Sequence, residues 1–152
     1  MTAPVLSLAT ALTTKLNELT GKQFIRRYAP FYESKDIESG KWLVLAAAEE
    51  YSQVARSVGR TIVSVDVGYQ VQMPPANNTN PDPLANLTFL DGCLNEVESV
   101  KALFKEGGSL QSVSFSDFVF KSMSNSPIYR TDILIEQQIF ISVIRLDFEV
   151  DN

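Results

Sequence analysis

A long alternating stretch, RTIVSVDVGYQVQM over residues 60–73, constrains this chain more than any other feature. Valine and tyrosine at odd positions alternate with polar or small residues at even positions, which is typical of a β-strand with one buried and one wetted face. At about 3.3 Å per residue the stretch would span roughly 43 Å, well beyond an ordinary strand of five or six residues. We therefore expect either a bulge at Gly68 or a strand that projects past the core.

Two other segments carry apolar side chains at spacings of three and four, which predicts amphipathic helices. The first runs over residues 5–19 and stops at Gly21. The second covers residues 87–104, with Asp82 as its N-cap and the glycines at 107–108 as its stop.

The remaining predicted strands are residues 24–29, 41–46, 113–120 and 140–150. Within 113–120 the apolar positions switch from odd to even, as a bulge would produce. Residues 47–59 fit neither period, so we expect either a long loop or a short helical turn there. The order of elements predicts a single α+β domain over residues 1–152, a mainly antiparallel β-sheet with two principal α-helices packed on one face.

Composition and charge exclude several functional classes. Thirteen Lys and Arg against eighteen Asp and Glu give a formal charge of −5, which disfavours binding to nucleic-acid phosphates or anionic lipid. The apolar and charged fractions, 45% and 20%, are those of an ordinary soluble protein, and neither a secretion signal nor a membrane span is expected. The one cysteine, Cys93, falls in a helical pattern and is expected to be a buried thiol.

Residues suited to catalysis are scarce. The chain has no histidine, which removes the usual general base and the usual metal ligand. The one adjacent carboxylate pair, Glu49 and Glu50, does not converge on either a helix or a strand. Neither of the glycine-containing turns sits in a phosphate-binding frame. We expect no enzyme activity, no catalytic residue, no metal and no cofactor.

Basic and aromatic groups leave alternatives open. Arg56 and Arg60 would share one side of a helical turn, as ordinary surface charges, in an interface salt bridge or in contact with a phosphate. Tyr28, Phe31 and Tyr32 cluster beside a proline, where they either bind another protein or pack under a loop.

Several segments together resemble a known family. The front half has Arg27-Tyr-Ala-Pro30, then Asp36-Ile-Glu-Ser-Gly-Lys-Trp-Leu-Val44, then the alternating stretch at 57–71. The back half has Pro127-Ile-Tyr129, then residues 133–136 and 138–148. This order is similar to that of the tail terminator, or tail completion, proteins of long-tailed bacteriophages. The arginine that the family usually has before the closing strand is replaced here by Gln137-Gln138.

The resemblance implies a structural virion protein at the junction of tail and neck, made in the cytoplasm of a bacterial host. Such a subunit forms a homo-oligomeric ring, commonly a hexamer, which caps the tail tube, ends its polymerisation and offers a surface for head–tail joining. Its partners would be the tail tube protein and neck or connector proteins, and DNA would pass through the lumen without specific binding. The residues implied at the subunit or tube interface are Glu49, Glu50, Tyr51, Arg56, Arg60, Gln70, Gln72, Asn77, Asn78 and Asn80.

Other functions remain open at this stage. A neck or head-completion subunit has a similar size and ring symmetry. A monomeric module that binds a peptide or small ligand through the aromatic cluster, and a hydrolase built on carboxylates alone, belong to different classes. The segment PPANNTNPDP at 74–83 is either a mobile connector or a contact with a neighbouring subunit, since its prolines end strand pairing and its asparagines allow tight turns.

Overall fold

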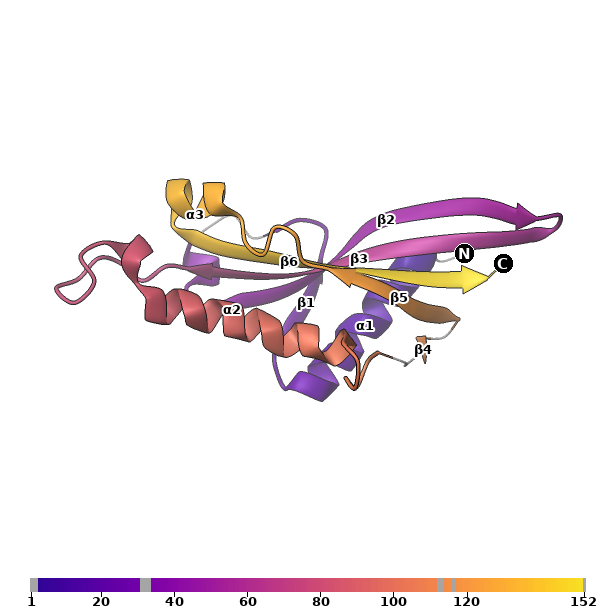
Figure 1. Cartoon of the computed structure of the whole chain (residues 1–152), viewed down its shortest axis with the longest axis horizontal. Coiled ribbons are helices and arrows are strands. Elements are labelled where there is room, and N and C mark those ends of the chain that lie inside the picture. Colours follow the sequence, from indigo (N-terminus) through magenta and orange to yellow (C-terminus); the bar gives the residue numbers. More distant parts are fainter. Residues whose placement is uncertain (1–2, 31–33, 112–113, 116, 152) are drawn as a thin grey trace.

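A computed structural model describes residues 3–30, 34–111, 114–115 and 117–151, which form one twisted sheet with helices beneath it (Figure 1). The sheet has six strands in the order β1-β2-β3-β6-β5-β4, and every neighbouring pair is antiparallel except β1 with β2. The strands are β1 Phe24–Arg27, β2 Lys41–Ala55, β3 Val58–Gln72, β4 Ser114–Phe115, β5 Phe118–Ser124 and β6 Ile139–Asp151. The helices are α1 Pro4–Thr20, α2 Leu87–Lys101 and α3 Thr131–Gln137, with 3-10 turns at Ser34–Ile37, Pro83–Ala85 and Ala102–Phe104. The predicted α+β class, mainly antiparallel sheet and two principal helices on one face are confirmed.

Helix α1 begins and ends where the sequence predicts. Pro4 occupies the first turn of the helix. Amide hydrogens in the first turn have no acceptor within the helix, so a proline, which has no amide hydrogen, is tolerated there. Gly21 adopts a φ of 69°, and its amide donates to the Asn17 carbonyl to close the helix. The buried side is formed by Leu8, Leu12 and Leu16, at the predicted helical spacing.

Helix α2 begins later than predicted. Asp82 does cap a turn, but its side chain accepts from Leu84 N in the short 3-10 turn Pro83–Ala85. The N-cap of α2 itself is Asn86, whose Oδ1 accepts from the Phe89 amide at 3.2 Å. Two capping residues four positions apart therefore start two successive turns, and the chain changes direction between them.

The core lies between these two helices and one face of the sheet. Strand β3 contributes its odd-numbered valines and β6 its even-numbered apolar residues, as their alternation predicts. The largest fully buried aromatic side chains of the core are Phe140 and Phe148, both on β6. One face of β3 is therefore fixed by the core, which also fixes the direction of its other face.

The opposite face of β3 was predicted to be exposed to solvent along its length, and the structure differs. Ser64 and Gln70 are buried, because β2 and β6 flank β3 along almost its whole length. Gly68 pairs in register with both neighbours, so no bulge lies there. The irregularities are in β2, between Ala46 and Ala48 and again between Gln53 and Ala55.

The predicted loop or helical turn at 47–59 is wrong. Strand β2 continues through residues 47–55, a tight turn follows, and β3 begins at Val58. Residues 47–55 are exposed at every position, so no alternating pattern marks them as strand. The second alternative for the long strand, extension past the core, is confirmed: this hairpin reaches beyond the helices (Figure 1).

The predicted single bulged strand at 113–120 is also wrong. Within the described residues it is two antiparallel strands, with Phe115 paired to Phe118. The switch from odd to even apolar positions therefore marks a reversal of the chain. Val113 lies outside the described residues. Helix α3, which the sequence analysis does not predict, lies at the start of β6.

Candidate interaction surfaces

The far part of the β2–β3 hairpin, residues 47–60, is here called the arm. It lies at one end of the molecule, where Arg60 pairs with Asp151 at the end of β6, while α3 and the loop before α2 lie at the other (Figure 1). Strand β1 pairs with β2 only as far as Leu45, so in the described structure the outer edge of β2 in the arm pairs with no other strand. Unpaired strand edges are ready sites for association with another chain.

One aromatic contact orders the arm from within. The ring of Tyr51 lies against Gly59 on the neighbouring strand and buries that glycine, although Val58 and Arg60 beside it are exposed. A β-carbon at Gly59 would collide with the Tyr51 ring, so only glycine accepts the ring in this position. The arm is thus a ribbon held in part by its own side chains.

The arm presents apolar side chains to solvent beside charged ones. Tyr51 is 63% exposed and Val54 is 51% exposed. Within the described residues Glu49 and Glu50 take part in no ion pair, whereas Arg60 binds Glu149 on β6 at 3.0 Å. Five of the predicted interface residues, Glu49, Glu50, Tyr51, Arg56 and Arg60, are therefore brought together on this one exposed ribbon.

A second surface, here called the trough, runs across the sheet face opposite α1 and α2. Three adjoining hollows share Ile141 and Val143 of β6 in their walls, with volumes of about 300, 200 and 290 Å³. Their apolar walls also include Leu45 and Pro30, and Gly68 lies in the middle hollow. The trough is lined by Pro30, Leu43, Leu45, Gly68, Gln70, Ile133, Ile139, Ile141 and Val143.

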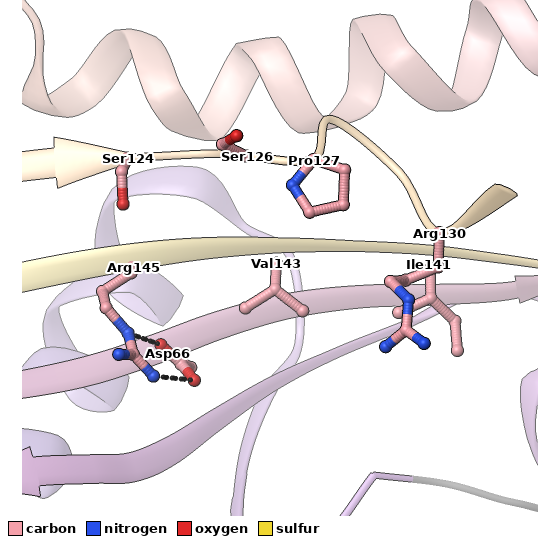
Figure 2. A pocket seen from close by; sticks show the side chains of 8 residues that line it. All are labelled: Asp66, Ser124, Ser126, Pro127, Arg130, Ile141, Val143 and Arg145. Atoms are coloured by element: carbon pink, nitrogen blue, oxygen red, sulfur yellow. Dashed lines mark hydrogen bonds and ion pairs between the residues drawn. The ribbon is translucent and has the colours of Figure 1, made fainter. Parts of the chain in front are cut away.

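Two arginines stand at the rim of the trough, on either side of this apolar floor (Figure 2). Arg145 donates to both carboxylate oxygens of Asp66, at 2.9 and 3.1 Å, across the β3–β6 pair. Arg130 donates to Asp132 in the same bidentate way, at 3.0 and 2.8 Å. These hydrogen bonds lower the pKa of the Asp132 carboxyl, and they raise the pKa of both guanidinium groups.

The connection from β5 to α3 forms one wall of the trough. Asn125 donates to the Ser142 hydroxyl at 3.1 Å and to the Val143 carbonyl at 2.7 Å. Ser142 in turn donates to the Ile128 carbonyl at 2.6 Å. These bonds tie the connection to β6 and so hold Arg130 at the rim, with its guanidinium on the same side of β6 as Val143 (Figure 2).

The other predicted interface residues do not join those of the arm. Gln70 is buried within the sheet and Gln72 is half-buried, so neither presents a free polar face. The predicted residues Asn77, Asn78 and Asn80 lie in the loop at the opposite end of the molecule from the arm (Figure 1). In that loop the Asn77 side chain accepts from the amides of Thr79 and Asn80, which closes a tight turn as predicted.

The aromatic cluster predicted near Pro30 is described only in part. Tyr28 is 78% exposed, and the guanidinium of Arg26 lies 5.4 Å from its ring centroid. Phe31 and Tyr32 lie outside the described residues. Pro30, the proline of this cluster, forms part of the wall of the trough.

A polar cluster beneath the sheet is structural in character. Glu96 of α2 accepts from the Trp42 indole at 3.0 Å and from Lys22 at 2.9 Å. Burial raises the pKa of the nearby Tyr69 hydroxyl to about 12 and that of the Cys93 thiol to about 11, and in both cases the Glu96 charge adds to the effect. The Tyr69 hydroxyl and the Cys93 thiol therefore stay protonated near neutral pH, and they are poor candidates for acid–base chemistry at that pH.

The trough has no clear signal in the sequence. Ile141 and Val143 belong to the predicted closing strand, but nothing in their spacing shows that the face they occupy lacks a covering layer. Asp66 was available as a signal, because it lies at an even, polar position of the alternating stretch, and in the structure it pairs in register with Arg145 of the closing strand. Pairing those two strands by their charges would have placed the two residues together.

The described part of the chain contains no group of three or more acidic, cysteine or histidine side chains arranged to hold a metal ion. No helix in it has both the length and the apolar character needed to cross a membrane.

Comparison with protein-family models finds no match. Comparison with curated protein sequences likewise finds no match.

Proposed function

We propose that this chain is a structural virion subunit of the tail terminator type, which assembles into a ring on the end of a phage tail tube. The observation that carries the proposal is the arm: residues 47–55 of β2 are exposed throughout and keep an unpaired outer edge. A two-stranded ribbon of this kind is only marginally stable in water by itself, so its exposed strands and unpaired edge suit a contact with another subunit.

The trough supports the same proposal from the other side of the molecule. It differs from the arm in shape and composition, and association of two different surfaces is heterologous. Repeated heterologous contacts either close into a ring or extend as a filament. Ring closure is what the resemblance to tail terminators implies, and the formal charge of −5 would let DNA pass through a lumen without adhering.

The first test is the state of association. Native mass spectrometry and size-exclusion chromatography over a hundredfold range of concentration should give one closed oligomer, and negative-stain microscopy should show rings. A monomer at every concentration would refute the proposal. As a matched control, Val119→Asp changes an exposed apolar residue outside both the arm and the trough, and it should leave the oligomer unchanged.

The second test separates a terminator from a neck or head-completion subunit, which is the alternative within the same class. The assembled protein is mixed with purified tail tubes and, separately, with connector. Capping of the tube ends supports the terminator function. Binding to connector with no binding to tubes would assign the chain to the neck.

A monomeric module that binds a peptide is the second candidate from a different class. The trough favours it, because the apolar side chains of Leu45, Ile141 and Val143 line a hollow of the size used for short ligands. A monomer that binds an extended apolar peptide, with loss of binding in Val143→Asp, would replace the ring proposal with this function.

A further inference from the structure

The arm and the trough are two surfaces that this chain cannot bring together within one molecule. Strand β3 runs from the arm at Arg60 to the trough at Gln70, and it pairs with β6 from residue 60 to residue 72. A strand so paired cannot bend back on itself without breaking the sheet. An arm that fills the trough therefore comes from another molecule.

The lengths of the two surfaces agree. Along β6 the trough extends from Arg145 to Ile139, six steps of strand or roughly 20 Å at about 3.3 Å per residue. The β2 strand of the arm, residues 47–55, extends for eight steps, or roughly 26 Å. One strand of the arm can thus cover the floor of the trough from end to end.

The apolar residues of the two surfaces also correspond. Val54 on the arm is 51% exposed, and Val143 on the floor is 39% exposed. Beside Val143 the floor continues with Ile141 and Leu45, both half-buried. Contact between these side chains would remove apolar surface from water on both partners.

The charges agree in sign and in spacing. Glu50 and Val54 are four residues apart on the arm, a separation of about 13 Å along the strand, and the irregularity between Gln53 and Ala55 lies at Val54. Arg145 and Ile141 are also four residues apart on one side of β6, again about 13 Å. The carboxylate and the apolar side chain of the arm are therefore spaced like the guanidinium and the apolar side chain of the trough.

The arginine at the rim has donors available for such a contact. Arg145 uses its Nε and one Nη2 hydrogen on Asp66, and a guanidinium carries five N–H donors. Glu50 takes part in no ion pair within the described residues. A carboxylate from outside can thus bind Arg145 without displacing Asp66.

From these observations we infer that the arm of one copy lies in the trough of the next copy, with Val54 against Ile141 and Val143 and with Glu50 against Arg145. The inference rests on the proposed function, since it names the contact by which the ring would form. Each copy gives its arm to one neighbour and receives an arm from another, so the contact is heterologous and propagates around the ring.

The experiment is a cysteine cross-link between the two surfaces. Val54→Cys and Val143→Cys are combined in a Cys93→Ala background and oxidised mildly at a concentration where the wild type is assembled. We expect a ladder of disulfide-linked species on a non-reducing gel that ends at the size of the ring. The matched control pairs Val54→Cys with Val119→Cys, an exposed residue outside the trough, and should cross-link at least tenfold less.

The outcomes are distinguishable. An oligomer whose Val54–Val143 pair cross-links no better than the control overturns this inference and leaves the ring standing. A ladder that stops at the dimer indicates a reciprocal pair and overturns both the inference and the ring. A monomer at every concentration overturns both as well.

A second variant guards against a folding defect. If Val143→Cys lowers the melting temperature, Ile141→Cys takes its place, since Ile141 also lies against Val54 in the inferred contact. In addition, Glu50→Lys should weaken assembly at least fivefold while Glu50→Gln weakens it less, and the difference should shrink in 0.5 M salt. Equal effects of the two substitutions would overturn the contact with Arg145.

Discussion

The ring of Tyr51 covers Gly59 on the neighbouring strand, and it buries that glycine within an arm that is otherwise exposed. The position of the ring depends on the missing side chain, because a β-carbon at Gly59 would come within 2.5 Å of Tyr51 Cε2. This single contact links the two strands of the arm on one of its faces. The order of the arm can therefore be altered without touching the core.

We expect Gly59→Ala to loosen the arm and to leave the fold almost unchanged. The added methyl group displaces a ring that is already 63% exposed, so the free energy of unfolding should change by less than about 1 kcal/mol. Amide hydrogen exchange measured by mass spectrometry should quicken over residues 51–60 alone. Tyr51→Phe keeps the ring and serves as the control, and unchanged exchange in Gly59→Ala would show that this contact does not order the arm.

Deletion of residues 77–80 should leave the thermal transition nearly unchanged and weaken assembly. The turn is closed by bonds within the loop, from Thr79 and Asn80 to the Asn77 side chain, and it contributes no residue to the core. Calorimetry and native mass spectrometry measure the two effects. A large loss of stability with assembly intact would mean that the loop supports the fold and is not an interface.

The Glu96 carboxylate should make stability depend on acid pH. Burial favours its protonated form, but hydrogen bonds from Lys22 and Trp42 outweigh burial and lower its pKa from 4.5. A pKa lowered by folding adds stability above the unfolded value, and that stability is lost as the pH falls through the folded value. Glu96→Gln should therefore cost about 1 kcal/mol at pH 7 and progressively less below pH 4 in urea unfolding curves. A cost that stays constant with pH would exclude this role.

The Cys93 thiol should resist modification until the protein unfolds. It is 4% exposed, and burial raises its pKa to about 11, so very little thiolate is present at pH 8. We expect Ellman's reagent to react at least tenfold more slowly in buffer than in denaturing urea. Rapid reaction of the native protein would show that α2 opens readily from the sheet.

The elements that were predicted correctly are those whose apolar side chains recur at the spacing of a single buried face. Helix α1 carries Leu8, Leu12 and Leu16 toward one layer, and the odd-numbered valines of β3 face the same layer. Periodicity in the sequence reports such one-sided burial directly. Asp66, at an even position of the same stretch, was likewise predicted on the opposite face of β3, where it pairs with Arg145.

The elements that were not predicted are those whose conformation or burial depends on neighbouring strands. Residues 47–55 form a strand because β3 offers them backbone partners, and no layer covers them to impose a pattern. Gln70 was expected to be wetted, but flanking strands bury it, and alternation along one strand does not reveal its position in the sheet. The trough could not be predicted for the same reason, since it arises from a face that other elements leave open.

The unbroken pairing of β3 also gives the molecule a mechanical axis. Thirteen consecutive residues of β3 pair with β6, from Arg60 beside the arm to Gln72 near α3. A pull along the arm would load these backbone hydrogen bonds together, in shear, instead of opening them one after another. Tension applied at one end of the sheet would thus be carried across the whole subunit by a single strand, and the helices beneath it would bear little of the load.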